Sequence, residues 1–132
     1  MNNSKTSSEY ILLFSGPDWD QGISPEELQQ RLDKVMAWFD GLQEQGRVKG
    51  GQPLAREGRT LSGQKVSDGP FAESKEAIGG YLLITADSIE EATNIAKSSP
   101  TLEYGVNIEV RQVLDECPCF KRAKERLALA TA

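Results

Sequence analysis

The sequence predicts an α+β fold, and three observations lead to this prediction. Apolar runs at residues 9–15 and 81–85 have the length and composition of buried strands, and weaker strand patterns begin near residue 48 and lie around 108–110. Two amphipathic helix patterns separate them, one between Ser24 and Gly46 and one between Ser88 and Pro100. The resulting order of strand, helix, strand, strand, helix, strand is typical of the ferredoxin-like split βαβ arrangement.

The first strand and the first helix have clear ends. The run "EYILLFS" at residues 9–15 is apolar at successive positions and stops before a Gly-Pro pair. Ser24 is a suitable N-cap, Pro25 fits the first helical position, and Glu27 lies where it can complete a capping box. An apolar stripe then repeats at helical spacing, formed by Leu28, Leu32, Val35, Met36, Phe39 and Leu42.

The middle of the chain is glycine-rich and irregular. Val48 begins a strand, and the following Gly50 and Gly51 allow a bulge or a close approach of two backbones. The segment "REGRTLSGQKVS" suggests a small hairpin with turns near Gly58 and Gly63. This region therefore adds a hairpin to the second strand of the fold.

The second half of the chain repeats the pattern of the first. Residues 81–85 form a strongly apolar strand, and Ser88 with Glu91 forms a second capping box. Pro100 ends the second helix. In the last strand Ile108 and Val110 alternate with polar residues, so one of its faces is wet.

These patterns predict the arrangement of the sheet. The first and third strands are the most apolar and belong in its middle, while the polar second and fourth strands suit its edges. The sheet is then mainly antiparallel, with two helices on one face. The middle strands carry apolar residues on both faces, and soluble monomers seldom expose such a surface. We therefore expect a homodimer with two-fold symmetry through the other sheet face.

The ends of the chain differ from its middle. Residues 1–8 are polar and are expected to be disordered, residues 9–114 form the domain, and residues 115–132 form a C-terminal tail. The tail contains a short basic helix that starts at about Phe120. Its basic residues are expected to form a solvated face, while Phe120 and Leu127 are expected to dock on the body of the protein.

Composition excludes several classes of function. The net charge of −5 argues against a nucleic-acid binder and against a polybasic membrane-surface protein. The first apolar run is too short for a signal peptide or a membrane span, so a cytoplasmic protein is expected. The chain has no histidine, which excludes Ser-His and Cys-His nucleophiles and the usual metal sites. Cys117 and Cys119 offer only two soft ligands and are expected to be reduced thiols, so no metal or cofactor is predicted.

The tetrapeptide "DGPF" at residues 68–71 is a chain-reversal signal and the first candidate site. The Asp68 carboxylate can cap its own turn, or it can lie at a pocket mouth as a base or a ligand contact. The loop around Trp19 is the second candidate, because loops often carry function. The full set of candidate ligand-binding residues is Asp68, Gly69, Phe71, Glu73, Lys75, Tyr10, Trp19 and Tyr81.

Two classes of function remain open from the residues. A dimeric module that binds a small ligand or a partner protein is favoured, because no nucleophile motif or metal cluster is visible. The alternative is a small-molecule enzyme of the proton-transfer or lyase type. In that enzyme Asp68 would be the base, in a partly desolvated pocket, and Tyr81 or Lys75 would orient the substrate.

The string "SDGPFAESKEAIGGYLLITADSIEEATNIAKSSP" followed by "VNIEVRQV" resembles the YCII-related, or DGPF-domain, family. The resemblance covers residues 9–113 and implies a dimeric ferredoxin-like fold in a bacterial protein. It also implies an accessory or regulatory role linked to extracytoplasmic-function sigma factors. A His-Asp pair has been proposed as an active site in the wider family; Asp68 resembles its aspartate, and its histidine has no counterpart here.

Overall fold

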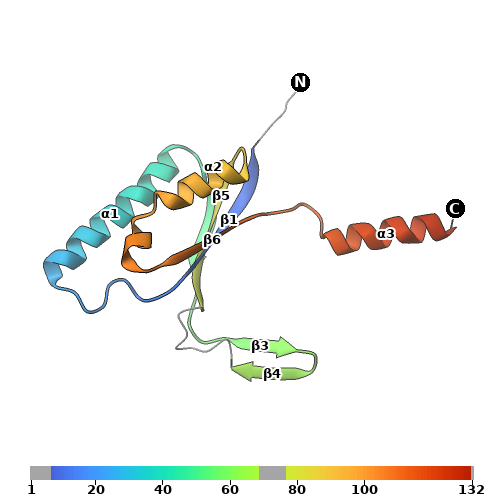
Figure 1. The fold of residues 1–132 in the computed structure, drawn as a ribbon, viewed down its shortest axis with the longest axis horizontal. Helices are drawn as coiled ribbons and strands as arrows, with labels where there is room; N and C mark the ends of the chain where they lie inside the picture. The colour runs from blue at the N-terminus through green and yellow to red at the C-terminus, as the bar shows by residue number, and fades with distance from the viewer. Residues whose placement is uncertain (1–6, 69–76, 132) are drawn as a thin grey trace.

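The computed structural model describes residues 7–68 and 77–131. A four-stranded sheet with the strand order β2-β5-β1-β6 forms its centre, and every pairing in it is antiparallel (Figure 1). The strands are β1 (Ser8–Ser15), β2 (Val48–Pro53), β5 (Ile78–Ala86) and β6 (Asn107–Gln112). The two apolar strands, β1 and β5, occupy the middle, so the predicted ferredoxin-like arrangement is confirmed.

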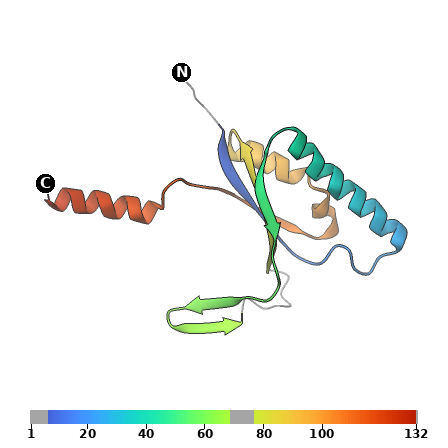
Figure 2. The ribbon, with the colours of Figure 1, turned by 180° about the vertical axis from the view of Figure 1, so that it is seen from behind.

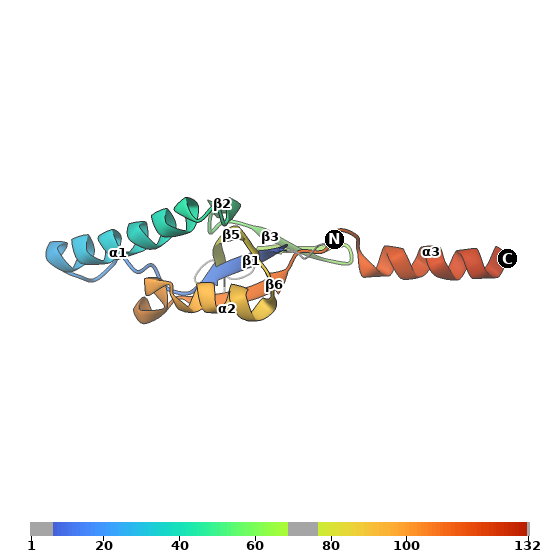
Figure 3. The same ribbon diagram turned by 90° about the horizontal axis from the view of Figure 1, so that it is seen from above.

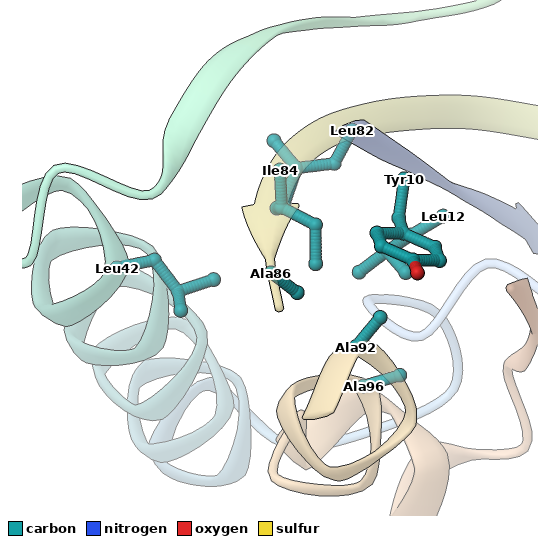
Figure 4. Close-up of a cluster of buried hydrophobic side chains, with 8 residues drawn as sticks. All are labelled: Tyr10, Leu12, Leu42, Leu82, Ile84, Ala86, Ala92 and Ala96. Carbon is teal, nitrogen blue, oxygen red and sulfur yellow. The ribbon is translucent and has the colours of Figure 1, made fainter. Parts of the chain in front are cut away.

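Two helices pack on the same face of this sheet. They are α1 (Pro25–Glu44) and α2 (Ile89–Lys97), and a short 3₁₀ helix, η1 (Pro100–Tyr104), follows α2. Figure 4 shows that Leu42 of α1 and Ala92 of α2 approach one row of strand side chains. Because Leu82, Ile84 and Ala86 alternate along β5, these side chains share the face that the helices cover.

The helix starts agree with the capping signals. The hydroxyl of Ser24 accepts the N–H of Glu27 at 3.1 Å, and that of Ser88 accepts the N–H of Glu91 at 3.0 Å. The Glu91 carboxylate reaches back to the N–H of Asp87 at 2.7 Å. The Glu27 carboxylate does not reach back, because it pairs with Arg31 one turn further along α1 at 3.0 Å.

The register of the middle strands determines which residues form the core. Tyr10 lies opposite Ile84, and Leu12 lies opposite Leu82. Leu12 and Ile84 are fully buried beneath the helices. Their neighbours in β1 and β5 point to the other face, which no described helix covers. We call this surface the open sheet face; its half-buried apolar members are Ile11, Leu13, Tyr81 and Leu83.

Two elements project from the body (Figures 1 and 2). One is the hairpin of β3 (Arg59–Ser62) and β4 (Lys65–Asp68), which confirms the predicted turn at Gly63. The other is α3 (Pro118–Thr131), which extends away from the sheet in Figure 3. The expectation that Phe120 and Leu127 dock on the body is wrong in this structure, because these side chains are 69% and 67% exposed.

The ends of the predicted domain are placed only in part. Residues 1–6 of the expected disordered N-terminal segment lie outside the described residues. The tail helix begins at Pro118, two residues earlier than the sequence predicts. Among the described residues, no helix combines the length and the apolar character that a membrane-spanning segment needs.

Arg47, which follows α1, contacts the end of β5 and the start of α2. Its guanidinium binds both oxygens of Glu91 at 3.2 Å and donates to the carbonyl of Thr85 at 3.0 Å. The N–H of Asp87, followed by the Arg47 guanidinium, holds the pKa of Glu91 below its ordinary value. This ion pair therefore joins the chain after α1 to the end of β5 and to the start of α2.

Replacing Glu91 by Gln should lower the free energy of unfolding at neutral pH, because the amide cannot form the charge-assisted bonds to Arg47. The native pKa of Glu91 lies below its ordinary value of 4.5. The carboxylate therefore stabilises the fold fully above pH 4.5, and this stabilisation is lost as the pH falls through the native pKa. Urea unfolding of both proteins should show a difference at neutral pH that shrinks in acid. Glu90→Gln, in the same helical turn, is the matched control, and an equal difference at both pH values would contradict this account.

Candidate functional site

A cavity of about 800 Å³ lies between the helix layer and one end of the sheet. Its walls come from the end of β1 and the loop after it, from α1, from β2 and its continuation to Gly58, from the start of β5, and from the region of η1. Its size falls within the range of about 300–1,000 Å³ that is usual for small-molecule sites. We refer to this space as the cavity.

Glycines account for the open space at this end of the sheet. Phe14 of β1 lies opposite Gly80 of β5, which has no side chain to fill the layer beneath α1. In the neighbouring row Gly51 of β2 lies opposite Leu82. A Cβ atom on Gly51 would lie 2.6 Å from the carbonyl oxygen of Tyr81, so β2 and β5 approach closely here, which is one of the two alternatives that the glycine pair allowed.

One wall of the cavity is aromatic. The rings of Phe14 and Trp38 lie 6.5 Å apart at 84°, and those of Trp38 and Phe39 lie 5.1 Å apart at 66°. Edge contacts of this kind are favourable for aromatic pairs. The indole N–H of Trp38 donates to the hydroxyl of Ser98 at 2.7 Å, which fixes the orientation of the ring. The wall is thus a rigid, apolar surface.

Two buried hydroxyls supply the polar part. Ser99 and Thr101 are 3% and 8% exposed, and their side-chain oxygens lie 2.7 Å apart. The Ser99 hydroxyl also accepts the N–H of Thr101 at 3.3 Å. Only one of the two hydroxyl hydrogens can lie between the oxygens. Among the bonds within the described residues, the other hydrogen has no acceptor, and both residues line the cavity.

The loop after β1 is held over the cavity by three contacts. Asp18 forms an ion pair with Arg56 at 3.2 Å, which joins this loop to the segment after β2. The carbonyl of Trp19 accepts a bond from Arg31 at 2.8 Å. The Trp19 ring packs on Tyr104 at 6.2 Å, and the Arg31 guanidinium lies 4.3 Å above the centre of the Tyr104 ring.

The structure places the side chains of three of the eight predicted site residues and the backbone of a fourth. Trp19 and Tyr81 line the cavity, although strand alternation directs the Tyr81 side chain to the open sheet face. Tyr10 is 4% exposed and belongs to the core, where its ring points toward α2 (Figure 4). The backbone of Asp68 ends β4 opposite Arg59.

Nothing further can be placed for the remaining five predicted site residues. The side chain of Asp68 is not described, and residues 69–76, which include Gly69, Phe71, Glu73 and Lys75, lie outside the described residues.

Most of the residues that give the cavity its chemistry carry no clear site signal in the sequence. Phe39 belongs to the predicted apolar stripe of the first helix, and Phe14 belongs to a predicted strand. Ser99 and Thr101 are marked in the sequence only by Pro100, which ends the second helix. The available signals were the adjacent aromatic pair at residues 38–39 and the two hydroxyls on either side of Pro100. Neither signal identifies a site until the fold brings them together.

The described part of the chain contains no group of three or more His, Cys, Asp or Glu side chains that could hold a metal ion. The carboxylates at the cavity have other partners. Asp18 is paired with Arg56, and Asp20 accepts a bond from Gln21 at 3.0 Å. The chemistry of the described walls is therefore that of aromatic stacking and hydrogen bonding.

Comparisons with known proteins identify one family and one similar fold. A family model described as the YCII-related domain matches residues 9–116. One similar solved structure is 5-chloro-2-hydroxyhydroquinone dehydrochlorinase from Burkholderia phenoliruptrix in complex with 2,5-dihydroxybenzoquinone. It has a TM-score of 0.46 and 17% sequence identity, covering 82% of this chain and 95% of that chain. No curated protein matches this sequence.

Substituting Ala at Gly51 should destabilise the fold more than the same substitution at Gly50. Both glycines have φ near +155°, at +154° and +159°, so a side chain at either costs about 1–3 kcal/mol in backbone strain. Only at Gly51 does the added Cβ atom also meet backbone, at 2.6 Å; at Gly50 its nearest neighbour is a side-chain atom at 3.9 Å. Urea unfolding of the two variants measures the difference, and equal losses of stability would contradict the close approach of β2 and β5.

Proposed function

Since this chain belongs to the YCII-related domain family, as its sequence predicted, we propose that it binds a small molecule in the cavity. The observation that carries the proposal is the combination of a fixed aromatic wall with a buried hydroxyl pair that retains one free donor among the described contacts. Ligand sites usually combine mostly apolar walls with a few oriented polar groups.

The walls also restrict the chemistry of the ligand. Phe14, Trp38 and Phe39 favour a flat, largely apolar ring, because ring contacts add about 0.5–1.5 kcal/mol beyond burial alone. The free hydroxyl hydrogen favours an oxygen acceptor on that ring, since a buried donor without a partner costs about 1–3 kcal/mol. The proposed ligand class is therefore an aromatic or quinone-like compound that carries a carbonyl or hydroxyl oxygen.

Binding is favoured over the proton-transfer or lyase chemistry that the sequence left open. A carboxylate that acts as a general base near neutral pH is usually shielded from water, which raises its affinity for a proton. The side chain of Asp18 is 59% exposed and paired with Arg56, so it does not meet this condition. The side chain of Asp68, which is the base in the alternative enzyme, is not described. The proposal therefore rests on the described walls of the cavity and is a binding or accessory role.

We also propose that the protein forms a homodimer through the open sheet face. The supporting observation is a row of half-buried apolar side chains in the two middle strands, on the face away from α1 and α2. Polar residues flank this row: Glu109 lies opposite Leu13, and Gln52 lies opposite Tyr81. An apolar centre with a polar rim is the usual composition of an interface between protein subunits.

The proposed ligand class is tested with 2,5-dihydroxybenzoquinone, which is a flat ring with oxygen acceptors. Isothermal titration calorimetry measures its affinity for the protein. Either hydroxyl alone still offers a donor, so Ser99→Ala and Thr101→Val should each retain most of the affinity. The double variant should lose about 5–10-fold, which corresponds to one hydrogen bond of about 1 kcal/mol.

Thr93→Val is the matched control, because it removes a hydroxyl from the exposed surface of α2, where Thr93 donates to the carbonyl of Ile89. Thermal unfolding confirms that each variant is folded. Absence of binding by the unmodified protein, or equal affinity of the double variant and the control, would contradict the proposal.

Introducing a charge at Leu83 tests the dimer. Leu83→Glu should convert the dimer to a monomer in sedimentation velocity, because it places a carboxylate in the middle of the open sheet face. Met36→Glu is the control; this side chain lies on α1 and is already 51% exposed, so the dimer should persist. If the unmodified protein sediments as a monomer at micromolar concentration, the proposed interface is wrong.

A further inference from the structure

The two cysteines lie together at the start of α3, apart from the cavity. Cys117 immediately precedes Pro118, the first residue of the helix, and its carbonyl accepts the N–H of Lys121 at 3.0 Å. This bond places Cys117 at the N-cap position. Cys119 follows in the first turn. Both thiols are free and exposed.

The N-cap position lies beside the N–H groups of the first helical turn. The N–H groups of Phe120 and then Cys119, together with the Cys119 side chain, hold the pKa of the Cys117 thiol below its ordinary value, because they stabilise the thiolate. The thiolate is the nucleophilic form of cysteine, so Cys117 is the more reactive of the two on these grounds.

One positive group contacts the second thiol. A guanidinium nitrogen of Arg122 donates to the sulfur of Cys119 at 3.4 Å. The nearby carboxylate of Glu116 is paired with the ammonium of Lys124, so its charge is largely compensated. Lys121 and Asp115 are the other charged neighbours in the sequence. The turn thus presents one sulfur with backbone donors and a second sulfur beside a guanidinium, both in contact with solvent.

We propose that Cys117 and Cys119 form a reversible redox pair, in which Cys117 attacks and Cys119 resolves. The oxidant is a small disulfide such as glutathione disulfide. The Cys117 thiolate attacks one of its sulfur atoms, a mixed disulfide forms, and the first glutathione thiolate leaves. Cys119 then loses its proton to water and attacks the sulfur of Cys117, which expels the second glutathione thiolate. The protein loses two electrons in total, and one disulfide is reduced to two thiols.

The geometry makes this disulfide easily reducible. Its ring encloses only one residue, Pro118, whose φ is fixed by its own ring. Oxidation also replaces the thiolate of Cys117, which the N–H groups at the helix start stabilise, with an uncharged sulfur, so these groups favour the reduced form. A dithiol whose reduced form is stabilised gives an oxidising, labile disulfide. The pair is therefore suited to a reversible response rather than to a permanent cross-link.

Oxidation should also affect the helix itself. α3 has 14 residues, and all of its described side chains are exposed, so packing on the body does not support it. Isolated helices of about 12–15 residues are marginal in water. Loss of the thiolate charge at the N-cap should therefore reduce the helical content of the tail, because a negative charge at a helix start stabilises the helix.

Intact mass spectrometry of the full chain under glutathione disulfide tests the pair. The unmodified protein should lose about 2 Da, for two hydrogens, without retaining glutathione. Cys119→Ser should stop at a single glutathione adduct on Cys117. Cys117→Ser should react at least about 5-fold more slowly, because the thiol that remains lacks the N-cap donors. Circular dichroism should show a fall in helical signal on oxidation that dithiothreitol reverses.

The matched control is Lys121→Gln, which removes a charge from the same turn without touching either sulfur in the structure. It should oxidise like the unmodified protein. Stable glutathione adducts on both cysteines, a disulfide between two chains, or equal rates for the two single Ser variants would each overturn the proposal.

Discussion

The rest of the structure depends on the pairing register of β1 with β5. This register places Leu12 beside Leu82 and Tyr10 beside Ile84, so that one face of the sheet collects the side chains that α1 and α2 cover. A shift by one residue would turn every one of them to the opposite face. The Arg47 contacts and the position of η1 both presuppose a helix layer that lies on this face.

The cavity is a consequence of the same register. Leu12 lies opposite Leu82, and their side chains fill the space between sheet and helices. In the next row on this face Phe14 lies opposite Gly80, which has no side chain to fill that space. The aromatic side chains of α1 reach this end of the sheet and border the space instead of closing it. Because β2 approaches β5 closely through Gly51, the floor is backbone rather than side chain. A site of defined shape thus results from missing side chains on the strands and large ones on the helix.

The tail helix α3 is stabilised by local contacts and not by packing on the body. The tail helix is held by its own backbone bonds and by local contacts such as the pair of Glu116 and Lys124. Its charges are mainly basic, although the whole chain is acidic, with a net charge of −5. Its N-cap is a cysteine where Ser or Asp is usual, so the proposed oxidation would act directly at the helix start. The pair at residues 117 and 119 is visible in the sequence, whereas the contacts of its sulfur atoms are not.

The sequence by itself determined the elements and their order, because capping by Ser24 and Ser88, helical periodicity and apolar runs are local signals within a few residues. It also marked Gly50 and Gly51 as the place of a bulge or a close backbone approach, and the structure has a register shift before Gly50 and the close approach at Gly51. Tertiary structure alone decided the site, because Phe14, Trp38 and Thr101 come from three distant segments and meet only through the strand register. The tertiary structure likewise placed Tyr10 in the core. Alternation along β1 shows which side chains share a face, but only the position of the helices shows which of the two faces is buried.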